Sequence, residues 1–255
     1  MPEKECVGSI LQHGLTAFDG QTIVVWASMI GTMAVRQLIV SIFIRAPLIA
    51  ISSSSFQGGG NHIHSDAVSE LIRRRRSIKP SQFNTQRIDD SVVSVLLENA
   101  NWAPTHGMTE PWRFFVFSDT ARESLGHALA GIYRTITPMD VLKPAKADKL
   151  VESCRRSSHV IAVAMKRQDS RKIPEIEEIE AVACAVQNLH LTATAYGLAG
   201  YWSSGKAICS DQFRDFLTLG PDDRILGLFY LGYTDDEWPD GHRSPAADKI
   251  QWFRE

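Results

Sequence analysis

The chain has 255 residues, 44% of them hydrophobic, and a formal net charge of −2 at pH 7. This length and composition are ample for a sizeable hydrophobic core. The nearly balanced charge argues against a protein that binds nucleic acid or an anionic membrane through bulk charge. Because the four cysteines form no C-x-x-C pair, the sequence predicts neither a zinc site nor a disulfide scaffold, and we expect a reducing, cytoplasmic location.

Residues 1–64 differ in composition from the rest of the chain. Residues 22–51 are strongly apolar, but Arg36 and Arg45 divide them into runs shorter than the roughly 20 residues that a membrane-spanning helix needs. Three interpretations stay open: a membrane-associated anchor, an extension that packs on the domain, or upstream sequence included through a wrong start codon. The run lengths favour the last two over membrane association. Serines and glycines between positions 52 and 60 predict a linker, so we expect one folded domain at residues 65–255.

Hydrophobic spacing predicts alternating helices and strands across this domain. The predicted elements, in chain order, are a helix from Ser65 into the arginine run, a helix at 88–102, a strand at 112–117, a helix at 120–133, a strand at 160–165, a long helix at 178–198 and a strand at 224–233. Residues 134–150 show no regular pattern, and the tail at residues 241–255 is expected to dock against the body of the domain. Small residues on the long helix allow close approach of another helix, either within the domain or across a dimer axis.

The first helix ends in four consecutive arginines, residues 73–76, followed by Ser77. Cations at a helix C-terminus complement the helix dipole, which explains two or three of them. Two guanidinium groups followed by a hydroxyl group are also suited to clamping a phosphate. The pattern by itself does not separate these interpretations.

Two further segments are suited to gripping a flat heteroaromatic ligand. The first is an ordered loop at Asn101–Trp112, which Pro104 and Pro111 hold rigid and which carries Trp102 and His106. The second segment, residues 201–206, is predicted to be a loop that offers an aromatic face, two hydroxyl groups and a glycine.

Several reactive motifs are absent from the sequence. It contains no G-x-G-x-x-G after a strand, no P-loop, no G-x-S-x-G and no H-E-x-x-H. We therefore predict no metal site and name no catalytic residue. An enzyme built on this chain would take its reactive centre from a bound cofactor.

Three motifs in this order resemble the nitroreductase family of flavin enzymes and, more narrowly, its YdjA-like branch. They are the helix that leads into Arg75-Arg76-Ser77, the Trp102–His106 loop with Glu110-Pro111-Trp112, and Gly200–Gly205. The likeness covers residues 65–253. It implies an α+β fold with a mixed, mainly antiparallel sheet flanked by helices, and a homodimer built on a long central helix with FMN at the interface.

The resemblance also implies which residues bind the cofactor. FMN would contact Arg75, Arg76, Ser77, Trp102, His106, Trp202, Ser203 and Ser204. NAD(P)H would pass hydride through the flavin to a small electron-poor acceptor, such as a nitroaromatic or quinone, in a ping-pong cycle. This sequence departs from the family pattern at Met108 and Glu110, where many relatives have Asn and Gln. It departs from the narrower branch at Trp102 and Ser203, where that branch has Arg.

Two alternatives stay open. One is a reductive dehalogenase resembling iodotyrosine deiodinase, which shares Thr109–Trp112, but residues 134–150 show no clear Glu, Tyr and Lys set for a zwitterionic amino acid. The other is a non-enzymatic module that binds flavin, or that binds nucleic acid through the arginine run.

Overall fold

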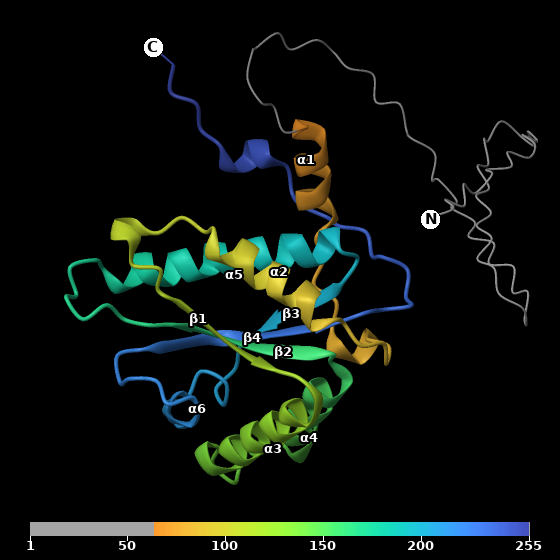
Figure 1. The fold of residues 1–255 in the computed structure, drawn as a ribbon, viewed down its shortest axis with the longest axis vertical. Helices are drawn as coiled ribbons and strands as arrows, with labels where there is room; N and C mark the ends of the chain where they lie inside the picture. Colours follow the sequence, from red (N-terminus) through yellow and green to blue (C-terminus); the bar gives the residue numbers. More distant parts are fainter. Residues whose placement is uncertain (1–63, 255) are drawn as a thin grey trace, which may run out of the picture. The chain divides into compact units, whose positions relative to one another are not determined.

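The computed structural model of the chain describes residues 64–254 (Figure 1). Residues 22–51, for which membrane association was considered, lie outside this range. Among residues 64–254, no helix is both long enough and apolar enough to cross a membrane.

The domain is built from helices packed against one sheet. The α-helices are α1 (Ser65–Arg74), α2 (Asp90–Asn101), α3 (Asp119–Ile136), α4 (Pro144–Arg156), α5 (Glu175–Ala195) and α6 (Asp211–Phe216). The strands are β1 (Trp112–Phe117), β2 (His159–Met165), β3 (Ala199–Ser203) and β4 (Arg224–Gly232). Short 3-10 helices lie at Pro80–Gln82, His106–Met108 and Ala246–Lys249.

The four strands form one sheet in the order β1-β2-β4-β3, and all neighbours are antiparallel. Trp112 is opposite Met165, His159 is opposite Leu231, and Trp202 is opposite Phe229. Every residue of β2 is buried, which explains its nearly continuous apolar sequence. One parallel bridge outside the strands joins Ser77 to Gly200, so the pairing is mixed but mainly antiparallel, as predicted.

Helices cover both faces of the sheet (Figure 1). Alternate residues of β2 point to opposite sides, as they do in any strand. Ile161 and Val163 pack in the core formed with α2 and α5, whereas Val160 and Ala162 pack in the core on the side of α3, α4 and α6. The α+β architecture is therefore three layers with the sheet in the middle.

Local sequence signals explain several helix boundaries. The Asp89 carboxylate accepts a hydrogen bond from the Ser91 backbone N–H and caps α2. The Ser210 hydroxyl accepts one from the Phe213 N–H and caps α6. Pro144 occupies the first turn of α4, where its missing N–H costs nothing.

The structure corrects three predictions made from the sequence. Residues 144–156, part of which had shown no regular pattern, form α4, whose buried residues are only Ala147 and Cys154, so its apolar stripe is too narrow to be recognised. Residues 201–203, predicted to be a loop, belong to strand β3. The C-terminal segment was expected to dock on the body of the domain, but Trp252 and Phe253 are 73% and 87% exposed.

Candidate functional site

The arginine run lies beside the start of β3, so two of the three predicted segments meet. The Ile78 N–H donates a hydrogen bond to the Gly200 carbonyl at 3.0 Å. His190 on α5 bonds the Arg76 carbonyl through Nε2 at 2.9 Å. A side chain at position 200 would crowd this region, because a Cβ there would lie 3.1 Å from Cδ2 of His190 and 2.8 Å from Cζ of Phe229. The contact joins residues more than 110 positions apart in the chain.

The arginines in this run have different surroundings. The Arg76 guanidinium donates to the carbonyls of Pro239, Arg73 and Arg75, so it holds the C-terminal segment against the run. Arg75 is half-buried, and no salt bridge is seen for it within residues 64–254. Burial lowers the pKa of Arg75, and the nearby positive charges of Arg243 and Arg76 lower it further.

This cluster of Arg75, Arg76 and Arg243 has the chemistry of an anion site. Three guanidinium groups that repel one another and include a partly desolvated member are stabilised by a multivalent anion. The sequence analysis did not identify Arg243, because it lies far along the chain in an irregular segment. The hydrogen bond from Trp238 Nε1 to the Arg74 carbonyl, at 2.7 Å, ties that segment to α1.

A cavity of about 1060 Å³ lies next to the end of β3. Its lining includes Ser203, Ser204 and Gly205, together with Lys79 just beyond the arginine run. Helix α4 supplies much of the opposite wall. Because β3 is an edge strand and, among residues 64–254, only Gly200 is bridged on its outer side, its later backbone groups are available to a ligand. The volume suits a cofactor-sized ring system.

The proline-bracketed loop lies elsewhere, at the other end of α5 (Figure 1). His106 Nδ1 is 2.5 Å from a carboxylate oxygen of Glu177, in the first turn of α5. His190, which contacts the arginine run, lies near the C-terminal end of the same helix. At about 1.5 Å per residue, the 13 steps from Glu177 to His190 span about 20 Å. His106 is therefore not brought to Arg75 within one chain.

The two tryptophans predicted to contact the cofactor differ in their environment. Trp102 follows α2 and is 79% exposed. Trp202 is 38% exposed, and its indole Nε1 lies 2.6 Å from where a Cβ on Gly227 would stand. Trp202 is thus fixed against β4, whereas Trp102 presents an uncovered aromatic face. Met108 and Glu110 adopt φ values of 54° and 44°, a strained backbone that is frequent at ligand sites.

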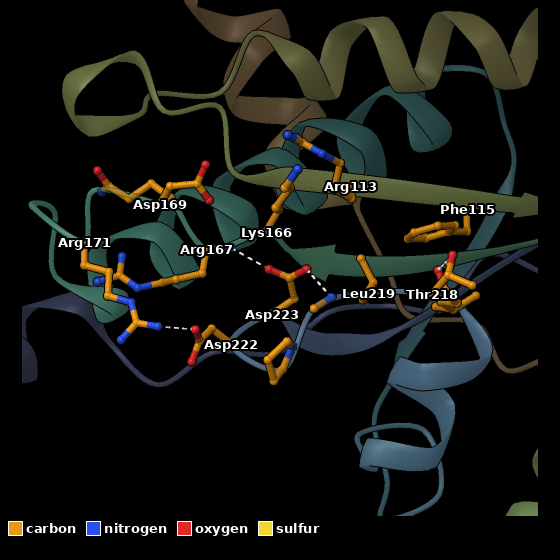
Figure 2. Close-up of a pocket in the computed structure, with 14 residues that line it drawn as sticks. Arg113, Phe115, Lys166, Arg167, Asp169, Arg171, Thr218, Leu219, Asp222 and Asp223 are labelled. Carbon is orange, nitrogen blue, oxygen red and sulfur yellow. Dashed lines mark hydrogen bonds and ion pairs between the residues drawn. The ribbon is translucent and has the colours of Figure 1, made fainter.

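A second cavity, of about 610 Å³, is lined by Arg113 and Phe115 of β1 and by the segments that follow β2 and precede β4 (Figure 2). Its charged groups are largely paired with one another or with the backbone. Arg171 pairs with Asp222, and the Asp223 carboxylate accepts hydrogen bonds from the N–H groups of Arg167 and Gly220 at 2.8 Å (Figure 2). These contacts brace the turn before β4. None of the predicted site residues lines this cavity.

Among residues 64–254, no group of three or more His, Cys, Asp or Glu side chains could hold a metal ion. The model for the nitroreductase family matches residues 72–233, which is more than half of the chain. The chain belongs to the nitroreductase family.

Individual nitroreductases and nitroreductase-like structures agree with this assignment. The Escherichia coli K12 protein named "Putative NAD(P)H nitroreductase YdjA" is 28% identical over 174 residues, covering 66% of this chain and 87% of the relative. A nitroreductase-like family protein from Bacillus cereus has a TM-score of 0.65 at 24% identity, covering 80% of this chain and 100% of that one. A Desulfovibrio desulfuricans nitroreductase structure in complex with FMN has a TM-score of 0.56 at 25% identity. This match covers 74% of this chain and 97% of that one.

These findings confirm three predictions made from the motifs. The family match and the YdjA relative confirm the nitroreductase assignment and its narrower branch. The structural likeness confirms the α+β fold. The enzyme class, an oxidoreductase of the nitroreductase family, follows from the family match.

Proposed function

We propose that this protein is an FMN-dependent NAD(P)H oxidoreductase that reduces small electron-poor acceptors such as nitroaromatics or quinones. The observation that carries the proposal is the meeting of the arginine cluster with β3 beside a cofactor-sized cavity, in a chain of the nitroreductase family. The YdjA relative is named as an NAD(P)H nitroreductase, and the Desulfovibrio desulfuricans structure contains FMN.

The arginine cluster would hold the phosphate of FMN. Arg75 and Arg243 offer charged donors without a carboxylate partner in the described part of the chain, and the Ser77 hydroxyl offers a neutral donor. A dianionic phosphate would offset the burial, and the repulsion from Arg243 and Arg76, that together lower the pKa of Arg75. Arg76 would act by holding residues 239–243 in place, and so by positioning Arg243.

The ring system would lie along the outer edge of β3 and in the adjacent cavity. Ser203 and Ser204 would supply hydroxyl and backbone donors and acceptors, and Lys79 would supply a positive charge. Trp202 would close one side. A bound flavin accepts hydride from a nicotinamide and returns two electrons to an acceptor, so this chain needs only to bind, orient and shield it.

The proline-bracketed loop would complete the site from a second copy of the chain. Within one chain its His106 lies at the wrong end of α5, and Trp102, which follows α2, is largely exposed. Large apolar side chains are also exposed on α1, α2, α5 and the C-terminal segment; they are Val68, Ile72, Val95, Tyr196, Trp252 and Phe253. A homodimer that buries these residues would bring Trp102 and His106 of one copy to the flavin of the other.

We also propose that residues 65–255 form the FMN-binding domain and that residues 1–64 are an extension outside it. The family match begins at residue 72 and supports this division. A cytoplasmic location is proposed on the cysteine pattern. It agrees with the thiols of Cys154, Cys184 and Cys209, which are free.

Purified protein tests the proposed function directly. We expect a yellow protein whose visible flavin bands are bleached by anaerobic NAD(P)H and restored by a nitroaromatic or quinone. Light scattering after gel filtration should give the mass of a dimer. Colourless protein that does not take up added FMN would exclude the proposal.

A further inference from the structure

The cavity beside β3 carries an excess of positive charge that binding the flavin does not require in full. Its cationic lining residues are Lys79, Lys146, Lys149, Lys206 and Arg156, against the acidic residues Asp148 and Glu152. No ion pair involves any of these four lysines within residues 64–254. Glu152 is already neutralised, because both its carboxylate oxygens accept hydrogen bonds from Arg155 at 2.8 Å.

Lys146 and Lys149 lie together on the cavity wall. They are three residues apart on α4, which places them on the same side of the helix. Both are in the N-terminal half of α4, where the helix dipole also favours negative charge. Lys206 approaches from the segment after β3, on the same side as Ser204.

An apolar wall adjoins these lysines. Tyr133, Leu150, Ala207 and Ile208 line the cavity, and Ala207 and Ile208 are buried. The Tyr133 hydroxyl accepts a hydrogen bond from the Lys143 N–H at 3.1 Å, which fixes its position. The cavity thus combines a rigid apolar surface with a pair of uncompensated ammonium groups.

We propose that the acceptor reduced at this site is an aromatic anion, whose ring packs on the apolar wall and whose carboxylate or sulfonate is bound by Lys146 and Lys149. This inference rests on the proposed function, since the acceptor must lie beside a flavin held at Ser203 and Ser204. The acceptor receives two electrons and two protons, from NAD(P)H and solvent. A quinone becomes a hydroquinone, and a nitro group becomes a nitroso group with release of water.

Binding of non-reducible probes tests the inference without turnover. In calorimetric titrations of the purified flavoprotein, 2-naphthoate should bind about three- to tenfold more tightly than 2-naphthamide, the gain expected from two exposed charge pairs. The difference should shrink in 0.5 M salt. It should also shrink in the double variant Lys146→Gln/Lys149→Gln, but not in Lys172→Gln, which changes an exposed lysine outside the cavity.

Kinetics supply a second, independent readout. The ratio of kcat/KM for 4-nitrobenzoate to that for 4-nitrobenzamide should fall about three- to tenfold in the double variant and stay constant in Lys172→Gln. Equal binding of the two naphthyl probes by the yellow, active wild-type protein would overturn the inference and leave the proposed function intact. The inference would also be overturned if the double variant bound NADPH more weakly but kept the same ratio of 2-naphthoate to 2-naphthamide affinity. The two lysines would then belong to the dinucleotide site. Loss of flavin is visible separately, as loss of colour.

Discussion

His190 bonds the backbone carbonyl of Arg76 through Nε2 at 2.9 Å, so a buried histidine on α5 fixes the end of the arginine run. Because a carbonyl only accepts hydrogen bonds, this nitrogen must carry the proton. Burial and the positive charge of Arg75 lower the pKa of His190 to about 4, against the smaller opposing effect of the Arg76 carbonyl. The neutral imidazole is therefore the form that holds the site together.

This relationship predicts an acid-sensitive domain. A histidine in the unfolded chain titrates near 6.5, so between pH 6.5 and 4 the unfolded state binds more protons than the native state. The stabilisation is complete above pH 6.5 and is lost as the pH falls to about 4. We expect up to about 3 kcal/mol of unfolding free energy to be lost in this window, measured by urea denaturation. The variant His190→Gln keeps an N–H donor and should make the unfolding free energy depend less on pH. A smaller dependence should remain from the buried His159, because burial lowers its pKa as well. Replacing the exposed His127 by Gln should leave the profile unchanged.

Arg75→Ala should weaken FMN binding by about 10- to 100-fold, the value of one hydrogen bond to a charged group. Fluorescence titration of the apoprotein with FMN measures this change. Arg73→Ala is the matched control, because it removes an exposed guanidinium from the same run. Equal FMN affinity of the two variants would remove Arg75 from the phosphate site.

Mixed dimers test whether each flavin site is shared between two chains. Suppose one copy carries Arg75→Ala and the other Trp102→Ala. A shared site leaves one intact site and one site with both lesions, so the mixed dimer should bind one FMN with wild-type affinity. Both homodimers should bind FMN weakly at both sites. Differently tagged chains, co-expressed and purified through both tags, allow the stoichiometry to be measured. A mixed dimer without a tight site would show that both residues act within one chain.

Gly227→Ala should unfold the domain at lower temperature. Gly227 has φ of 144°, and an added Cβ would lie 2.6 Å from both the Ser203 carbonyl and the Trp202 indole. We expect a loss of about 2–4 kcal/mol, together with weaker FMN retention, because β3 would be displaced from β4. Gly131→Ala on α3 meets nothing within 4 Å and should instead raise the stability by up to about 1 kcal/mol. The melting temperatures of the two variants can be compared by calorimetry. Similar melting temperatures would refute the packing argument.

Deleting residues 1–60 should leave a yellow dimer with unchanged FMN affinity, because all the proposed site residues lie after residue 64. Light scattering and the visible spectrum measure both properties. A truncated chain that fails to fold would show that the extension is part of the domain.

Much of the local structure follows from the sequence, because it depends on neighbouring residues. The run Trp112–Phe117 forms β1 with the predicted bounds, and the Asp89 cap starts α2. The continuous apolar run after His159 forms the buried strand β2. The sequence did not predict helix α4, because the buried residues of this helix are the small side chains of Ala147 and Cys154, which form only a weak apolar pattern.

The sequence by itself determined the family and the order of most helices and strands, and it predicted the segments proposed to carry site residues, because periodicity and short motifs are local properties of a chain. Only the tertiary structure decided which of these segments meet. Ser77 pairs with Gly200, Arg243 joins Arg75, and α4 closes the cavity, whereas His106 is held about 20 Å away by the length of α5. Such contacts depend on how the sheet and helices pack in three dimensions, and no spacing along the chain encodes them.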